Sequence, residues 1–228
     1  TPTRTGYTFG GWYTAASGGT KVGNGGAKYT PTANITLYAH WSGNNYTVSY
    51  NANGGSGAPS SQTKTYGVNL TLSSTKPTRT GYDFNGWNTN SSGTGTNYAS
   101  GGIYSANASV TLYAKWTPHT YTVSYNANGG SGAPSSQTKT YGVNLTLSTT
   151  KPTRTGYTFN GWNTNSSGTG TNYASGGTYS ANASVTLYAK WTPNTYTVKY
   201  YFDGVEQTSL KQTCTYGTSY KYPSLPTK

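Results

Sequence analysis

Acidic side chains are nearly absent from this sequence of 228 residues. Asp83, Asp203 and Glu206 are the three carboxylates, against 15 lysines and arginines, so the formal net charge is +12 at pH 7. Glycoside hydrolysis requires two carboxyl groups within reach of one bond, and a usual calcium site requires several carboxylate oxygens. With so few acids, the sequence argues against both kinds of site.

Cysteine, histidine and methionine are also scarce. Cys214 is the one cysteine and methionine is absent, so the sequence can form neither an internal disulfide nor a cysteine-based zinc site. His40 and His119 have no cysteine or acid beside them in the sequence, and we interpret both as solvated surface residues. We therefore predict no enzyme activity, no metal and no cofactor.

Long apolar runs and targeting segments are missing too. No stretch of about 20 apolar residues and no secretory leader occurs, so we predict no membrane insertion by this segment. The sequence starts at Thr1 in the middle of a repeat, and we expect it to be a fragment of a longer protein. The missing targeting signals therefore say nothing about the parent protein.

What the sequence does contain is a repeat of 75 residues. The segments Tyr46–Trp116 and Tyr121–Trp191 differ at three of their 71 positions, namely Ser74/Thr149, Asp83/Thr158 and Ile103/Thr178. Residues 1–41 correspond to the later half of the same unit, and residues 196–228 begin another copy that has diverged. Such self-similarity at a fixed period indicates an array of small structural units.

Two divisions of the chain fit this period. One gives a C-terminal half-repeat, two complete repeats and a diverged N-terminal half-repeat, at 1–41, 46–116, 121–191 and 196–228. Because Pro2, Pro77 and Pro152 also lie 75 residues apart, the other gives units at 1–75, 76–150 and 151–228. A half-repeat of about 40 residues buries little surface alone, so head-to-tail contact through the terminal halves is a further expectation.

Alternation of apolar and polar residues predicts short strands at 46–50, 66–72 and 110–116, with an edge strand inside the loop 88–102. No window shows a long helical period, so any helix is short. We predict a mainly β fold of the β-rich α+β class. Its expected core residues in the first complete repeat are Val48, Leu70, Leu72, Phe84, Trp87, Leu112 and Ala114.

Short links connect the repeats. The four residues TPHT lie between Trp116 and Tyr121, and TPNT lies between Trp191 and Tyr196. A proline in so short a link leaves the chain little freedom. We therefore expect small domains arranged as an elongated array.

The order of four motifs, YTVSYNANGG, KTYG, PTRTGYxFNGW and VTLYAKW, resembles the Listeria–Bacteroides repeat family, which includes the B-repeat of internalins. The resemblance covers essentially the whole chain, although Tyr201-Phe202-Asp203-Gly204 departs from the YNANGG pattern. It implies tandem β-grasp, or ubiquitin-like, domains on bacterial surface and secreted proteins. It also implies a spacer or adhesion role, with no catalytic residues to carry over.

The glycine-rich segment NANGGSG, residues 51–57, is a weak candidate for a phosphate-binding loop. It lacks the Lys and Ser/Thr that follow the glycines of a P-loop, and no helix is predicted after it. We interpret it as the turn of a hairpin.

Recurring basic residues suggest one binding hypothesis. The recurring pairs are Lys64/Lys139, Lys76/Lys151, Arg79/Arg154 and Lys115/Lys190. Arg79, Lys115, Arg154 and Lys190 are candidate contacts for an anionic cell-wall polymer or glycan, attracted by counterion release. The alternative is that these cations keep a polar stalk soluble. Nucleic acid is not expected, because no RNA- or DNA-reading motif is present.

Aromatic residues suggest a second hypothesis, a neutral glycan site. Each complete repeat is rich in tyrosine, and we predict that the candidate exposed contacts are Tyr98, Tyr104 and Tyr113, together with Tyr173 and Tyr179 of the second complete repeat. In a small β domain, aromatic residues more often pack in the core and across strands. Salt separates the two hypotheses, because only binding to an anionic polymer weakens steeply as salt rises.

The sequence as a whole therefore predicts a non-catalytic stalk or adhesion module of a bacterial cell-surface or secreted protein. Near-identical copies suit a spacer, whose length follows from copy number, and also a multivalent binder, whose linked weak sites gain avidity. Multivalent binding of an anionic polymer or glycan is the alternative function. A cell-surface polysaccharide or a host or partner protein is the expected partner.

Overall fold

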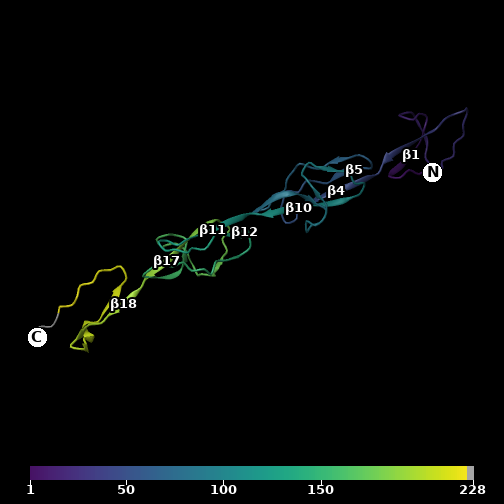
Figure 1. Ribbon diagram of the computed structural model, residues 1–228. Helices are drawn as coiled ribbons and strands as arrows, with labels where there is room; N and C mark the ends of the chain where they lie inside the picture. The colour runs from purple at the N-terminus through teal and green to yellow at the C-terminus, as the bar shows by residue number, and fades with distance from the viewer. Residues whose placement is uncertain (225–228) are drawn as a thin grey trace. The chain divides into compact units, whose positions relative to one another are not determined.

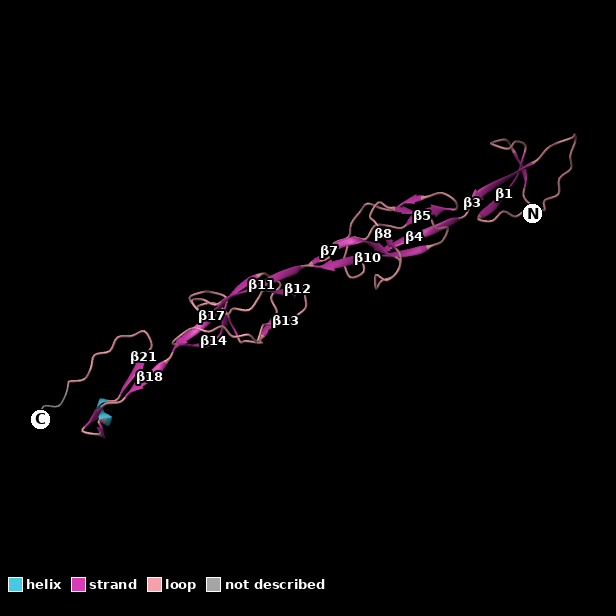
Figure 2. Cartoon of the chain, in the orientation of Figure 1, coloured by secondary structure: helices cyan, strands magenta, loops and turns pink. Residues whose placement is uncertain are grey.

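The computed structural model describes residues 1–224 and is built almost entirely of strands and loops (Figures 1 and 2). Within the described residues the one helical element is a 3-10 turn, η1, at Thr208–Leu210. The chain divides into two compact units, Thr1–Pro118 and His119–Lys228. The prediction of a mainly β fold is confirmed.

Unit 1 holds a three-stranded sheet followed by a complete repeat. The three-stranded sheet has the order β2-β1-β3, with β1 at Tyr7–Tyr13, β2 at Lys21–Gly23 and β3 at Tyr38–Gly43. The complete repeat has a five-stranded sheet in the order β5-β4-β10-β7-β8, and a separate pair of β6 and β9. Its strands are β4 (Asn45–Asn51), β5 (Gln62–Thr65), β6 (Leu70–Thr71), β7 (Tyr82–Asn88), β8 (Asn97–Tyr98), β9 (Ile103–Tyr104) and β10 (Val110–Pro118).

Unit 2 begins with the second complete repeat, which has the same strand order, β12-β11-β17-β14-β15, and the pair β13-β16. Two antiparallel two-stranded sheets follow, β18 with β21 and β19 with β20. Its strands are β11 (Thr120–Asn126), β12 (Gln137–Thr140), β13 (Leu145–Thr146), β14 (Tyr157–Asn163), β15 (Asn172–Tyr173), β16 (Thr178–Tyr179), β17 (Val185–Pro193), β18 (Thr195–Val198), β19 (Tyr201–Phe202), β20 (Val205–Glu206) and β21 (Gln212–Thr215).

In each complete repeat the first and last strands lie side by side and parallel. Val110 of β10 is opposite Val48 of β4, and Val185 of β17 is opposite Val123 of β11. A parallel pair cannot be joined by a tight turn and needs a crossover. The residues between the two strands therefore pass from one edge of the sheet, at β5, to the other edge, at β8.

The core of each complete repeat is a compact cluster around one tryptophan. Trp87 is fully buried, with the rings of Tyr50 and Phe84 at centroid distances of 4.8 and 5.1 Å. Burying each large apolar side chain contributes about 1.5–3 kcal/mol. The buried cluster of the first complete repeat is Val48, Leu72, Trp87, Tyr104, Leu112 and Ala114. Of the seven expected core residues, five belong to this cluster, and Leu70 and Phe84 pack against it.

The sequence interpretation of residues 66–72 as one strand is wrong. β5 ends at Thr65, a turn follows, and only Leu70–Thr71 form a strand again. Val68 lies in the turn and is 59% exposed, and its N–H donates to the carbonyl oxygen of Thr65. Gly67, with φ near 75°, takes a left-handed conformation that interrupts the alternation. The expected edge strand inside 88–102 is β8, and that prediction is confirmed.

A lysine is buried in each complete repeat. Lys64 is 1% exposed, and its Nζ donates to the carbonyl oxygen of Thr65 at 2.8 Å and to Oδ1 of Asn107 at 2.9 Å. Lys139 repeats the arrangement with Thr140 and Asn182. These two of the recurring basic residues therefore hold loops together inside the domain and are not accessible to a polymer.

Candidate functional site at the repeat joints

A single residue joins consecutive sheets within each unit. In unit 1, β3 ends at Gly43 and β4 begins at Asn45, so Asn44 alone connects them. Its N–H donates to the carbonyl oxygen of Gly6 at 2.9 Å, and its carbonyl oxygen accepts from the N–H of Tyr66 at 2.8 Å. Both backbone groups of Asn44 are thus bonded, one to each of the sheets that it connects.

Unit 2 repeats this joint at Asn194, between β17 and β18. The N–H of Asn194 donates to the carbonyl oxygen of Gly156 at 2.8 Å, and the N–H of Tyr216 donates to its carbonyl oxygen at 2.8 Å. The hydroxyl of Thr158 adds a bond to Oδ1 of Asn194 at 2.7 Å. The expected four-residue link TPNT is therefore corrected to one residue, because strand pairing continues through the neighbouring residues.

A glycine in each joint makes room for a tyrosine ring from the next sheet. Gly156 has φ near 77°, and a β-carbon there would lie 2.3 Å from the ring of Tyr216. Gly6 stands in the same relation to Tyr66, at 2.2 Å. Only glycine can place its backbone so close to the ring while holding a left-handed conformation.

The turn that carries this glycine also places an arginine on an aromatic ring. The N–H of Tyr157 donates to the carbonyl oxygen of Arg154, which closes the turn, and the Arg154 guanidinium lies 4.0 Å from the centroid of the Tyr157 ring. Arg4 over Tyr7 and Arg79 over Tyr82 have the same 4.0 Å separation. Each such cation–π pair contributes about 0.5–1 kcal/mol at an exposed site.

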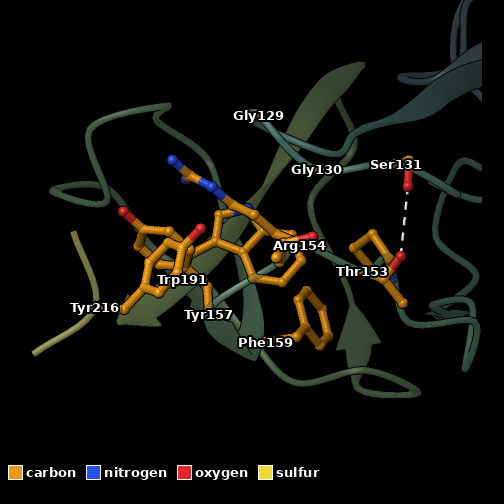
Figure 3. A pocket seen from close by; sticks show the side chains of 11 residues that line it. Gly129, Gly130, Ser131, Thr153, Arg154, Tyr157, Phe159, Trp191 and Tyr216 are labelled. Carbon is orange, nitrogen blue, oxygen red and sulfur yellow. Dashed lines mark hydrogen bonds between the residues drawn. The ribbon is translucent and has the colours of Figure 1, made fainter. Parts of the chain in front are cut away.

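A hollow of about 860 Å³ opens beside this turn in unit 2 (Figure 3). Arg154, Tyr157, Trp191 and Tyr216 line it together with the backbone of Gly129 and Gly130. The Tyr157 and Tyr216 rings meet edge to face at a centroid distance of 5.5 Å. The hollow thus lies against two successive sheets, because Tyr216 follows β21 whereas the other side chains belong to the complete repeat.

Trp191 is held in this hollow by the glycine-rich loop. Its Nε1 donates to the carbonyl oxygens of Ala127 and Asn128, at 2.9 and 3.1 Å. A β-carbon on Gly130 would lie 2.6 Å from the indole ring, so the loop needs glycine to approach it. The NANGGSG segment is therefore the loop of the β4–β5 and β11–β12 hairpins, and that interpretation is confirmed.

A corresponding hollow of about 550 Å³ lies in unit 1, lined by Arg79, Tyr82, Phe84 and Trp116. Trp116 Nε1 donates to the carbonyl oxygens of Ala52 and Asn53, as Trp191 does to its own loop. Asp83 also lines this hollow, whereas the second complete repeat has Thr158 at that position. The hollow of unit 2 is therefore the one with fewer acids.

Three of the four predicted basic contacts, Arg79, Arg154 and Lys190, line hollows. Arg79 and Arg154 line them directly. Lys190 and Arg154 together border a second, smaller hollow of about 300 Å³. Lys115 and Lys190 hold their Nζ atoms 3.4 and 3.3 Å from amide oxygens of Asn97 and Asn172.

Four of the tyrosines predicted as exposed contacts are less available than expected. Tyr104 and Tyr179 are 2% and 3% exposed, and their hydroxyls donate to the carbonyl oxygens of Ala108 and Ala183. Burial raises the pKa of both. The expectation that these two are exposed is wrong, because β9 and β16 turn them into the core.

Tyr98 and Tyr173 are half-buried and pack edge to face on Tyr104 and Tyr179, at centroid distances of 5.6 and 5.5 Å. They do not line the hollows around Arg79 and Arg154. Any contact of theirs with a polymer would involve a different part of each repeat.

His40 also differs from its prediction as a solvated residue. Its ring is half-buried, stacks on Tyr13 at a centroid distance of 3.8 Å, and forms a hydrogen bond with the carbonyl oxygen of Ala15 at 2.9 Å. Among the described residues no group of three or more histidine, cysteine, aspartate or glutamate side chains is arranged to hold a metal ion. In the same part of the chain, no helix has the length and apolar character needed to cross a bilayer.

Sequence reasoning missed Tyr157, Trp191 and Tyr216 as site residues. A local signal did exist, because Arg-Thr-Gly-Tyr places an arginine and a tyrosine at the two ends of a four-residue turn. Nothing in the sequence shows that Tyr216, 59 residues after Tyr157, reaches the same hollow.

Two mixed sheets of identical order, each preceding or following a one-residue joint, define a repeat-containing, mainly β protein. The chain belongs to the Listeria-Bacteroides repeat domain family, whose model matches residues 1–40, 46–115 and 121–190. The resemblance inferred from the sequence motifs is confirmed.

Relatives place the chain among longer bacterial proteins. It is 34% identical over 237 residues to a protein of Evansella cellulosilytica named "Putative Gly-rich membrane protein", matching 99% of this chain and 26% of that protein. It is 39% identical over 117 residues to Internalin H of Listeria monocytogenes, matching 51% of this chain and 20% of that protein. The chain thus spans about a quarter or less of these relatives. No solved structure matches it significantly.

Proposed function

We propose that the chain is a non-catalytic stalk or adhesion segment of a bacterial surface or secreted protein. The observation that carries this proposal is the one-residue joint at Asn44 and at Asn194, with both backbone groups bonded. A spacer must keep its length and so must not bend freely. The joint resists bending because the backbone donor and acceptor of its only linking residue are both hydrogen-bonded. The names of the relatives, a membrane protein and an internalin, support a surface location.

We also propose that each complete repeat is a β-grasp domain. The order β5-β4-β10-β7-β8, with the first and last strands parallel at its centre, supports this assignment. In place of a long helix, the crossover between β6 and β7 consists of turns and extended chain. The resemblance noted from the sequence motifs implies the same fold.

A distance measurement across one joint tests the stiffness that a spacer needs. Spin labels on cysteines replacing the exposed Ser166 and Thr218, in a Cys214→Ser background, report the separation of the two sheets joined at Asn194. We expect a narrow distribution of distances in the otherwise native chain. A broad distribution would contradict the spacer proposal.

Two substitutions of the linking residue sharpen this test. Asn194→Pro removes the N–H that bonds to Gly156, so we expect the distance distribution to broaden. Asn194→Ala keeps both backbone groups and loses only the bond to Thr158, so it should stay close to native. If the two variants behaved alike, backbone bonding would not be what stiffens the joint.

A further inference from the structure

Arg154 retains hydrogen-bonding capacity that its own fold does not use. The side chain is half-buried, stacks on Tyr157, and makes a long hydrogen bond from Nη1 to the carbonyl oxygen of Asn128 at 3.5 Å. A guanidinium has five N–H donors in a planar fork that matches a carboxylate or a phosphate. The stacking fixes this fork at the edge of the hollow, so little conformational freedom is lost when an anion binds.

The surroundings of Arg154 favour an anion. None of the described residues lining the two hollows beside it is acidic, and Lys190 borders the smaller one. The whole chain carries a net charge of +12. An anionic polymer therefore gains both a specific partner and the release of its counterions.

The rest of the hollow presents aromatic surface. Phe159, Trp191 and Tyr216 line it, with the Phe159 and Trp191 rings edge to face at a centroid distance of 5.7 Å. All three side chains are partly exposed. Partly exposed rings beside a fixed charge suit a ligand that is apolar on one side and charged on another. The C–H face of a sugar or polyol has that character.

We propose that the hollow lined by Arg154, Tyr157, Trp191 and Tyr216, here called the Arg154 groove, binds an anionic polyhydroxylated polymer. Carboxylate or phosphodiester oxygens pair with Arg154, and the carbon-bound face of the polymer lies on Trp191 and Tyr216. The hollow around Arg79 supplies a second, weaker site, because Asp83 lines it. Each chain then carries two such sites, and linked weak sites gain avidity where one polymer reaches both. The inference rests on the proposed surface role, in which such polymers are the surrounding material.

Binding of the full chain to three defined probes tests the proposal. The probes are hyaluronan, which carries carboxylates, poly(glycerol phosphate), which carries phosphodiesters, and neutral dextran. We expect binding to one or both anionic probes at about 50 mM salt, much weaker binding at about 200 mM, and no competition by dextran. Preference for hyaluronan would assign the ligand to acidic polysaccharides, and preference for poly(glycerol phosphate) would assign it to polyol phosphates. Binding to neither anionic probe would overturn the proposal.

Matched variants separate the groove from general attraction. Arg79→Ala with Arg154→Ala removes two charges from the grooves, and Lys28→Ala with Lys211→Ala removes two exposed charges elsewhere. We expect the groove pair to weaken binding about tenfold and the control pair to weaken it less than about threefold. Equal losses of affinity in the two pairs would show that net charge alone attracts the polymer, and would overturn the proposal that the groove binds it.

A conservative pair guards against loss of fold. Arg79→Lys with Arg154→Lys keeps both charges and removes the planar fork, so we expect an intermediate loss with an unchanged unfolding midpoint. Native affinity in this pair would overturn the role of the guanidinium. Failure of binding would leave the spin-label distances across Asn194 untouched, so the two proposals can fail separately.

Discussion

The ring of Tyr216 lies against the backbone of Gly156, at a distance that leaves no space for a β-carbon. Gly156→Ala should therefore push the ring away and weaken the joint at Asn194. The left-handed φ costs about 1–2 kcal/mol for any non-glycine residue, and displacement of the ring adds to it. Hydrogen exchange of the Asn194 and Tyr216 amides measures the effect, and both should exchange faster.

Gly142 provides the control for this substitution. It has φ near 71°, but no atom lies within 4 Å of the β-carbon that alanine would add. Gly142→Ala should destabilise the second complete repeat by the φ cost alone and leave exchange at Asn194 unchanged. Equal exchange at the joint in both variants would mean that the contact with Tyr216 does not maintain it.

The buried lysines should stabilise the fold through their hydrogen bonds and packing, and not through their charge alone. Lys139→Ala removes two hydrogen bonds and leaves a cavity, so we expect a loss of about 2–4 kcal/mol in the free energy of unfolding. Lys151→Ala removes the same charge from an exposed position and should change it by less than about 0.5 kcal/mol. Urea unfolding of the two variants compares them directly, and similar losses would contradict the buried role.

Asn128 should contribute to stability through both its backbone conformation and its side-chain hydrogen bonds. Its backbone φ is near 50°, and its side-chain Nδ2 donates to the carbonyl oxygens of Ser166 and Ala189. Asn128→Gly tolerates this φ and loses only the two bonds, at a cost of about 1–2 kcal/mol, whereas Asn128→Ala adds about 1 kcal/mol of backbone strain. In thermal unfolding, the native chain should have the highest midpoint, the glycine variant a lower one and the alanine variant the lowest. The NMR signal of the Trp191 indole N–H should shift in both variants. An alanine variant as stable as the glycine variant would refute the strain.

Alkaline pH should destabilise the complete repeats through their buried tyrosines. Burial, with a smaller contribution from Tyr98, raises the pKa of Tyr104 above 10.0, and Tyr179 is raised in the same way with a contribution from Tyr173. The unfolded chain therefore loses these protons at a lower pH than the folded chain. Stability from this source is complete below about pH 10 and falls as the pH rises toward the folded pKa.

Phenylalanine at both positions isolates this effect. Tyr104→Phe with Tyr179→Phe removes the titrating hydroxyls, so the unfolding midpoint should fall less steeply above about pH 10 than in the native chain. Thermal unfolding at a series of pH values measures the two slopes. Parallel slopes would assign the alkaline loss to other groups, such as Tyr50 and Tyr125, whose pKa burial also raises.

Much of the fold was predictable because the same pattern of apolar and polar residues occurs in both complete repeats. Alternation of apolar and polar residues located β4 and β10, and five of seven expected core residues are buried in the first complete repeat. The prediction failed at residues 66–72. Val68 and Leu70 continue the apolar alternation, but Gly67 turns the backbone just before them. Alternation records side-chain type and does not reveal such a turn.

The candidate site was less predictable than the core. Arg79 and Arg154 were found because basic residues recur in each complete repeat. Tyr104 and Tyr179 were misplaced because tyrosine suits both surface and core. The burial of Lys64 depends on Asn107, 43 residues away. Long-range partners of this kind are set by the crossover of the chain, which a single sequence does not display.

The joint has a consequence for how such genes can change. Gly156 with its arginine turn and Tyr216, which packs on it, are 60 residues apart, and Gly6 and Tyr66 have the same separation. The separation is shorter than the 75-residue period, so each period encodes both surfaces of a joint. Unequal recombination that adds or deletes one period supplies a matching pair of surfaces each time. The length of the protein can thus evolve by copy number without the invention of a new contact.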